Sequence, residues 1–141
     1  MKNFETKRKD IQEFCKKNSF DLLILFGSSA TKKTHRYSDV DIAIVPNHSV
    51  GTKPNKLDLL DQLCAMFNTD LIDLVMITSE TDPLLLLEIF SKGHALFEAE
   101  SGLFNKNYLR AWKHFLDTSA IRKVQKNLLM KSIRDLNPHV A

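Results

Sequence analysis

Two aspartates separated by one residue, Asp39 and Asp41, are the side chains in this sequence best spaced to do chemistry together. Residues two positions apart in a strand point to the same side, so a strand here would hold both carboxylates side by side. Carboxylates that close repel each other unless a cation lies between them. Mg²⁺ is typically held by one or two carboxylates together with substrate phosphates. The spacing therefore predicts a divalent-metal site.

The dipeptide Gly27-Ser28 lies ten residues before this pair. A glycine lets the backbone approach a ligand closely, and a helix that begins near Ser28 would direct free N–H groups at a phosphate. Phosphate donors facing metal-binding carboxylates are the apparatus of nucleotidyl transfer. The sequence contains neither the GxxxxGK[ST] phosphate loop nor the GxGxxG dinucleotide motif. We therefore expect a triphosphate and Mg²⁺ to bind through the Gly-Ser turn and the carboxylates, and not through either of those motifs.

A third carboxylate is expected from a strand predicted over residues 70–77, which contains both Asp70 and Asp73. These two residues are three positions apart, so their side chains would point to opposite faces of that strand. Only one of them can join the metal site, and the hydrophobic pattern does not choose between them.

The surrounding elements follow from hydrophobic periodicity and from glycine and proline positions. Short apolar runs predict strands, and apolar residues three or four apart predict helices. The expected fold is α/β (α+β), a small mixed sheet of about four strands flanked by helices, with a helical C-terminal tail. The predicted strands are Leu22–Phe26, Asp39–Val45, 70–77 and Ala95–Glu98; the predicted helices are 3–17, 57–67, Leu84–Phe90 (capped by Asp82 and Pro83 and stopped by Gly93), Leu103–Leu116 and Ala120–Leu136.

Composition limits the class of protein. The chain has 141 residues, enough for one domain with a core, and a net charge of +3. It lacks a signal-peptide core and any apolar run near the ~20 residues that span a bilayer, so we expect a cytoplasmic protein without a membrane segment. Cys15 and Cys64 show no CxxC spacing and are expected to be ordinary apolar positions in a reducing compartment.

The C-terminal tail has two features of its own. Residues 101–141 carry eight Lys and Arg but only two acidic residues, which fits either a solvated helix face or contact with an acidic partner or RNA. Phe104, Tyr108, Trp112 and Phe115 fall on one helical face. Core packing is the expected use of this stripe, and a partner groove is the alternative.

Together these residues resemble a known family. Gly27-Ser28, ten residues and Asp39-Val40-Asp41 form a GSx10DxD pattern similar to that of the DNA polymerase β-like nucleotidyltransferase superfamily, and Ala30 and Ser38 match as well. The later sequence resembles the ending of the minimal nucleotidyltransferase (MNT) group, through Ile72–Val75, Pro83, Gly93 and Ala95–Glu98. The resemblance covers about residues 15–100 and aligns the family's third carboxylate with Asp73.

The resemblance implies ATP as nucleotide donor, two Mg²⁺ ions, and Gly27 and Ser28 at the phosphates. It implies catalytic and metal-binding roles for Asp39, Asp41 and Asp73. Where the family often has Arg-Gly after the alanine, this chain has Thr31-Lys32. Lys32 or Lys33 is expected to contact the phosphates as a point charge instead. The expected organisation is one nucleotidyltransferase domain over 1–141, with a core at about 15–100 and a helical extension at about 102–137.

Short MNT proteins resemble the antitoxins of HEPN/MNT toxin–antitoxin pairs. The implied activity, of type VII character, is Mg²⁺-dependent transfer of AMP from ATP to a tyrosine of a HEPN RNase toxin, which neutralises the toxin. A chain of 141 residues leaves no room for a separate substrate domain, which favours a macromolecular acceptor. Direct nucleic-acid binding is not expected. The alternatives are a non-catalytic antitoxin that acts by binding, and a small-molecule nucleotidyltransferase of the aminoglycoside type.

Overall fold

The computed structural model describes residues 7–27, 39–49 and 54–137, and its centre is a four-stranded sheet in the order β3-β2-β1-β4. Strand β1 is antiparallel to β2 and β4, whereas β2 and β3 are parallel. The parallel pair needs a crossover connection, which α3 supplies. The elements in chain order are α2 (Arg8–Lys17), β1 (Phe20–Phe26), β2 (Val40–Pro46), α3 (Lys56–Phe67), β3 (Ile72–Met76), α4 (Pro83–Lys92), β4 (His94–Glu98), α5 (Leu103–Asp117) and α6 (Ser119–Leu136).

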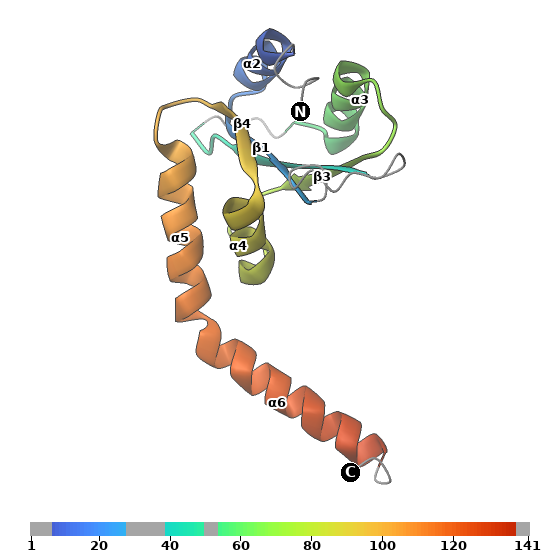
Figure 1. Ribbon diagram of the computed structural model, residues 1–141, viewed down its shortest axis with the longest axis vertical. Coiled ribbons are helices and arrows are strands. Elements are labelled where there is room, and N and C mark those ends of the chain that lie inside the picture. Colours follow the sequence, from blue (N-terminus) through green and yellow to red (C-terminus); the bar gives the residue numbers. More distant parts are fainter. Residues whose placement is uncertain (1–6, 28–38, 50–53, 138–141) are drawn as a thin grey trace.

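Helices cover both faces of this sheet (Figure 1). Helices α2 and α3 pack on one face, where Leu23 and Ile42 enter a core with Phe14. Helices α4 and α5 pack on the other face, where Ile24 and Ala43 enter a second core. Alternate residues of β1 and β2 thus serve opposite cores, which explains why both strands are almost continuously apolar. The predicted mixed sheet, flanking helices and helical tail are confirmed.

The predicted boundaries hold to within a few residues, with one difference that matters. Helix α4 begins as expected, since the Asp82 carboxylate accepts a hydrogen bond from the backbone N–H of Leu84 at 2.8 Å. Strand β3 begins at Ile72 rather than at residue 70. The Thr69 hydroxyl accepts from the backbone N–H of Leu71 at 3.2 Å, a local turn that precedes the strand. Asp70 therefore lies outside the sheet. The part of the predicted first helix before residue 7 and the short helix predicted after Ser28 lie outside the described residues.

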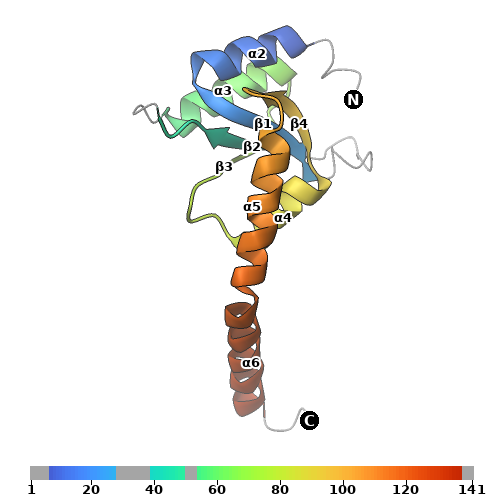
Figure 2. The ribbon, with the colours of Figure 1, turned by 90° about the vertical axis from the view of Figure 1, so that its left-hand side faces the viewer.

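The aromatic stripe of α5 serves the core only in part. Phe104 and Tyr108 pack against the core beneath α4 and α5, with the Phe104 and Phe90 rings 5.3 Å apart. Trp112 is 41 % exposed, so core packing is the wrong expectation for that residue. Beyond it, α6 leaves the body of the protein and extends away from it (Figure 2), and it has no buried residue.

No helix in the described ranges is both long and apolar enough to cross a membrane.

Gly93, between α4 and β4, is required by space rather than by backbone conformation, because its φ is −81°. A Cβ at this position would lie 2.2 Å from the Ile89 carbonyl oxygen and 2.7 Å from Cγ2 of Ile24. We therefore expect Gly93→Ala to lower the free energy of unfolding by about 1–3 kcal/mol, as overpacked cores do. Chemical denaturation measures this. The control Ser91→Ala, on the exposed side of α4, is expected to stay within about 0.5 kcal/mol of the unsubstituted chain. Equal stability of the two variants would contradict this account.

Candidate active site

The site is built where β1 ends and β2 begins. Phe26, the last residue of β1, pairs with Asp41 near the start of β2. Gly27 follows with a φ of +72°, a conformation that favours glycine. A Cβ on Gly27 would lie 2.0 Å from Oδ2 of Asp41 and 2.8 Å from its Cγ. The Asp41 carboxylate therefore lies directly against the Gly27 backbone, and only glycine leaves room for it.

The parallel register of β2 and β3 brings a second carboxylate to Asp41. Asp73 is the register partner of Asp41, so the two side chains extend from the same face of adjacent strands. This is the face covered by α4 and α5, because Ala43 and Val75, two residues further along each strand, enter that core. The structure thus brings Asp73 beside Asp41 and leaves Asp70 before the strand.

Asp39 is exposed and comes immediately before β2. It lies close enough to Asp41 to affect its ionisation, as the spacing of two predicts. Two other predicted residues, Ser28 and Lys32, lie outside the described residues.

The electrostatics of the site centre on Asp41. Burial raises the pKa of the Asp41 carboxyl above its ordinary value, and repulsion from Asp73, Asp39 and Glu88 raises that pKa further. Every one of these contributions disfavours the ionised form. The site therefore concentrates negative charge that a bound cation would relieve.

Glu88 is a residue that sequence analysis missed. It lies on α4, 47 positions after Asp41, and it reaches the neighbourhood of the site because α4 packs on the same face of the sheet. Nothing in its local sequence distinguishes it from an exposed helix residue, and it also lies 3.7 Å from the Lys92 ammonium group. Only the packing of α4 on the sheet reveals the connection.

The donor set suits Mg²⁺ shared with a phosphate ligand. All the candidate ligands are carboxylate oxygens, which Mg²⁺ prefers. Within the described ranges, no three His, Cys, Asp or Glu side chains already form a metal-binding group. Mg²⁺ commonly takes only one or two carboxylates and completes its coordination with water and substrate phosphates, so a closed protein cage is not needed.

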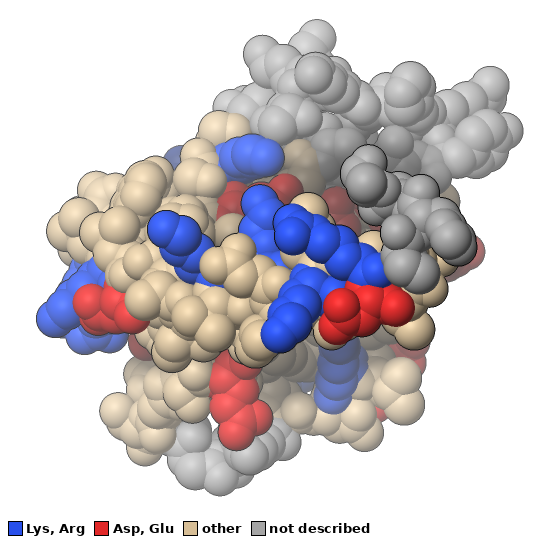
Figure 3. All heavy atoms as spheres, turned by 90° about the horizontal axis from the view of Figure 1, so that it is seen from below, with Lys and Arg blue, Asp and Glu red and all other residues tan. Residues whose placement is uncertain are grey.

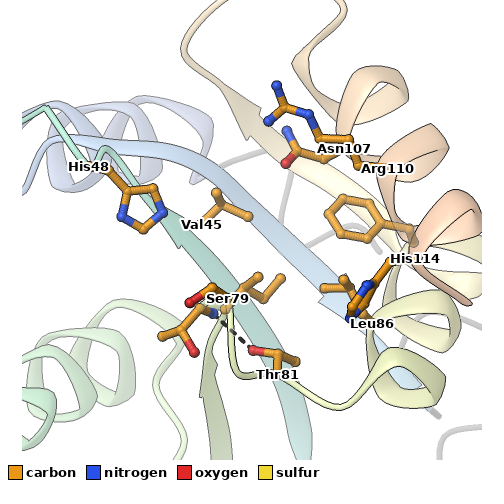
Figure 4. A pocket seen from close by; sticks show the side chains of 11 residues that line it. Val45, His48, Ser79, Thr81, Leu86, Asn107, Arg110 and His114 are labelled. Atoms are coloured by element: carbon orange, nitrogen blue, oxygen red, sulfur yellow. Dashed lines mark hydrogen bonds between the residues drawn. The ribbon is translucent and has the colours of Figure 1, made fainter. Parts of the chain in front are cut away.

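A separate cavity of about 370 Å³ lies on the same face at the other ends of β2 and β3 (Figure 4). Val45 and Ile77 line it, four residues beyond Asp41 and Asp73, or roughly 13 Å along the strands. Its polar lining comes from His48, from Thr78, Ser79 and Thr81, and from Asn107, Arg110 and His114 on α5. None of the carboxylates among the described residues lines this cavity. It is therefore distinct from the aspartate site.

The sequence matches the family model described as polymerase beta, nucleotidyltransferase, over residues 9–101. That range contains Gly27 and all three aspartates and ends just before α5. None of the curated proteins compared with this chain matches it.

Several solved structures share the fold. A chain of a toxin–antitoxin complex with AMP-PNP is 20 % identical, with a TM-score of 0.70 over 87 % of this chain and 98 % of that one. A chain of a complex between a tri-AMPylated Shewanella oneidensis HEPN toxin and an MNT antitoxin is 18 % identical, with a TM-score of 0.65 over 90 % and 98 %. A chain of an MntA–HepT toxin–antitoxin complex is 18 % identical, with a TM-score of 0.65 over 89 % and 98 %.

The repulsion at the site is open to direct measurement. Asp73→Asn removes one negative neighbour, so we expect the pKa of Asp41 to fall toward its ordinary value, while burial still keeps it raised. An NMR titration that follows the assigned carboxyl carbon signal of Asp41 measures this pKa. Asp70→Asn is the matched control, and it should leave the Asp41 titration unchanged. A larger shift from Asp70→Asn than from Asp73→Asn would refute the placement of the third carboxylate.

The raised pKa of Asp41 also predicts how stability depends on pH. The pKa of Asp41 is higher in the folded chain than in the unfolded chain. At a pH above the folded-state pKa, the ionised carboxylate therefore lowers the free energy of unfolding. This loss disappears as the pH falls below the unfolded-state pKa. Without metal, Asp41→Asn should therefore melt at a higher temperature than the unsubstituted chain at neutral pH. The gain should shrink on acidification through that window. A variant less stable at neutral pH would be the opposite result.

Proposed function

The chain belongs to the polymerase beta nucleotidyltransferase family, and on this basis we propose that it is an antitoxin that transfers AMP from ATP to a HEPN RNase toxin. The observation that carries the proposal is the carboxylate pair Asp41 and Asp73, set in register against the Gly27 backbone. This arrangement suits a metal-bound triphosphate, and the family performs nucleotidyl transfer.

The structural neighbours support the choice of acceptor. One is described with an ATP analogue, and another with a HEPN toxin that carries AMP groups beside an MNT antitoxin. A nucleotidyltransferase chain corresponds to the MNT member of such a pair.

In the proposed donor site, one group of residues binds the phosphates of ATP and another group binds the metal. Gly27 and Ser28 bind the phosphates through close backbone approach and a hydroxyl, and Lys32 adds positive charge. Asp39, Asp41 and Asp73 would hold Mg²⁺, most simply as two ions. When bound, Mg²⁺ would neutralise the carboxylates and the phosphates and stabilise the negative charge that develops on the leaving pyrophosphate.

The reaction is a substitution at the α-phosphorus of ATP. The acceptor tyrosine oxygen forms a bond to this phosphorus, while the bond from the α-phosphorus to the oxygen bridging it to the β-phosphorus breaks and pyrophosphate leaves. The tyrosine proton passes to a carboxylate of the site, which we assign to Asp73, one of its two exposed aspartates. The products are AMP-tyrosine and pyrophosphate, so no oxidant or further reactant is required.

The position of Asp73 suits a bulky acceptor. Strand β3 is an edge strand of the sheet, and Asp73 is exposed on it, as is Asp39 before β2, whereas Asp41 is partly buried. A protein that approaches from solvent therefore finds Asp73 at the surface of the site.

Incubation with ATP, Mg²⁺ and the proposed HEPN partner should add whole AMP units to that protein. Asp41→Asn should abolish the addition, and Asp73→Asn should slow it by about 100-fold or more, the usual cost of losing a general base. Intact-mass spectrometry of the HEPN protein measures this. Asp70→Asn is the control and should transfer AMP at the unsubstituted rate.

Two results would count against the proposal. Absence of AMP on the HEPN protein with the unsubstituted chain would reject protein adenylylation. Neutralisation of the toxin that survives Asp41→Asn in full would favour an antitoxin that acts by binding alone.

A further inference from the structure

Helix α6 carries a stripe of exposed apolar side chains that the body of the protein does not cover. Ile121, Val124 and Leu128 are three and four residues apart, and Leu129, Ile133 and Leu136 form an adjoining row with spacings of four and three. Between 49 and 80 % of the surface of each of these six side chains is exposed. We call these six residues the α6 stripe.

A helix with these properties is costly on its own. Most helical stability in proteins comes from packing an apolar face. Helix α6 nevertheless buries none of its residues. Gathered exposed apolar side chains of this size are typical of an interaction site. Trp112 and Leu116 near the end of α5 are exposed as well.

The direction of α6 is fixed at its base. The Arg122 guanidinium group donates hydrogen bonds to the Thr118 hydroxyl and the Phe115 carbonyl oxygen, and it lies 3.9 Å from the centre of the Phe115 ring. These contacts tie the first turn of α6 to the last turn of α5. Helix α5 in turn packs on α4, on the face of the sheet that carries Asp41 and Asp73. Helix α6 therefore continues from the side of the sheet that carries the two carboxylates (Figure 1).

The charges on α6 decide what kind of molecule fits it. Outside the Arg122 junction, the helix has four basic residues and one acidic residue: Lys123, Lys126, Lys131, Arg134 and Asp135. Seen from the end of the molecule that α6 occupies, Lys and Arg side chains run across the middle of the surface (Figure 3). A second copy of α6 would place like charges beside each other, which disfavours self-association. An apolar groove with an acidic rim complements both the stripe and its flanks.

The exposed apolar side chains of α6 are Ile, Val, Leu and Met, and none of them is aromatic. Helices that lie on membranes usually add Trp or Phe to such a face, whereas aliphatic residues at these spacings suit packing against another helix or groove in a protein. A protein partner is thus favoured over a lipid surface.

We propose that the α6 stripe is the docking surface for the acceptor protein, which seats an apolar, acid-rimmed groove on it and so brings its hydroxyl to the carboxylate site. This inference rests on the proposed function in one respect, the identity of the acceptor. Docking and chemistry are then separate parts of the molecule: α6 holds the partner, and the start of β2 and β3 performs the transfer.

The test uses the full chain and its proposed HEPN partner, with binding measured by calorimetry. Leu128→Asp should weaken binding about tenfold and Leu128→Asp with Ile133→Asp about 100-fold, since buried apolar anchors carry most of an interface's energy. Gln62→Asp is the matched control, because it adds the same charge at an exposed position of α3, on the opposite face of the sheet, and it should bind normally. Higher salt should slow association with the unsubstituted chain, because the complementary charges are screened.

A second readout separates this inference from the proposed function. Binding of a fluorescent ATP analogue with Mg²⁺ should be unchanged in the stripe variants, whereas Asp41→Asn should bind the HEPN protein normally but transfer no AMP. A chain that binds the HEPN protein through the stripe without transferring AMP would remove the proposed function and leave the docking surface intact.

Three outcomes would overturn the docking surface itself. The first is unchanged binding of the HEPN protein by the stripe variants, or no binding by the unsubstituted chain. The second is a dimer of the chain alone, seen by analytical ultracentrifugation, that Leu128→Asp dissociates. The third is binding of vesicles containing phosphatidylserine that the same substitution abolishes.

Discussion

The contact between the Asp41 carboxylate and the Gly27 backbone is the constraint on which the site depends. The carboxylate occupies the space that any side chain at position 27 would need. The contact exists because β1 and β2 are antiparallel and pair Phe26 with Asp41 at the edge of their ladder. It fixes the turn after β1, the direction of Asp41 and, through the parallel register with β3, the position of Asp73. The cost is a partly buried carboxylate among other acidic side chains, a site that favours a bound cation.

The sequence predicts those parts of the site that depend on short-range periodicity. A spacing of two places Asp39 and Asp41 on one side, and the apolar runs on either side identify both strands. The choice between Asp70 and Asp73 depends instead on which face of β3 meets the site, and the parallel register that pairs Asp73 with Asp41 fixes that face. Apolar patterning does not show this register. The family resemblance, which rests on more distant positions, selects the residue that the structure brings beside Asp41.

Long-range packing accounts for what the sequence does not predict. Glu88 affects the ionisation of Asp41 only because α4 lies on the sheet. Trp112 continues the aromatic spacing of Phe104 and Tyr108, yet its side chain is exposed. Helical periodicity is the same for a face that packs in the core and a face that awaits a partner. The separation of core from docking surface in α5 and α6 is therefore a property of the tertiary fold.

The account as a whole requires that the α-phosphate of ATP, and not the γ-phosphate, reaches the partner protein. The most direct measurement incubates the chain and the HEPN protein with Mg²⁺ and ATP that carries a radiolabel on either the α- or the γ-phosphate. We expect the α-label to become covalently attached to the HEPN protein and the γ-label to be released in pyrophosphate. Attachment of the γ-label would contradict the account, and so would the absence of both labels from the HEPN protein.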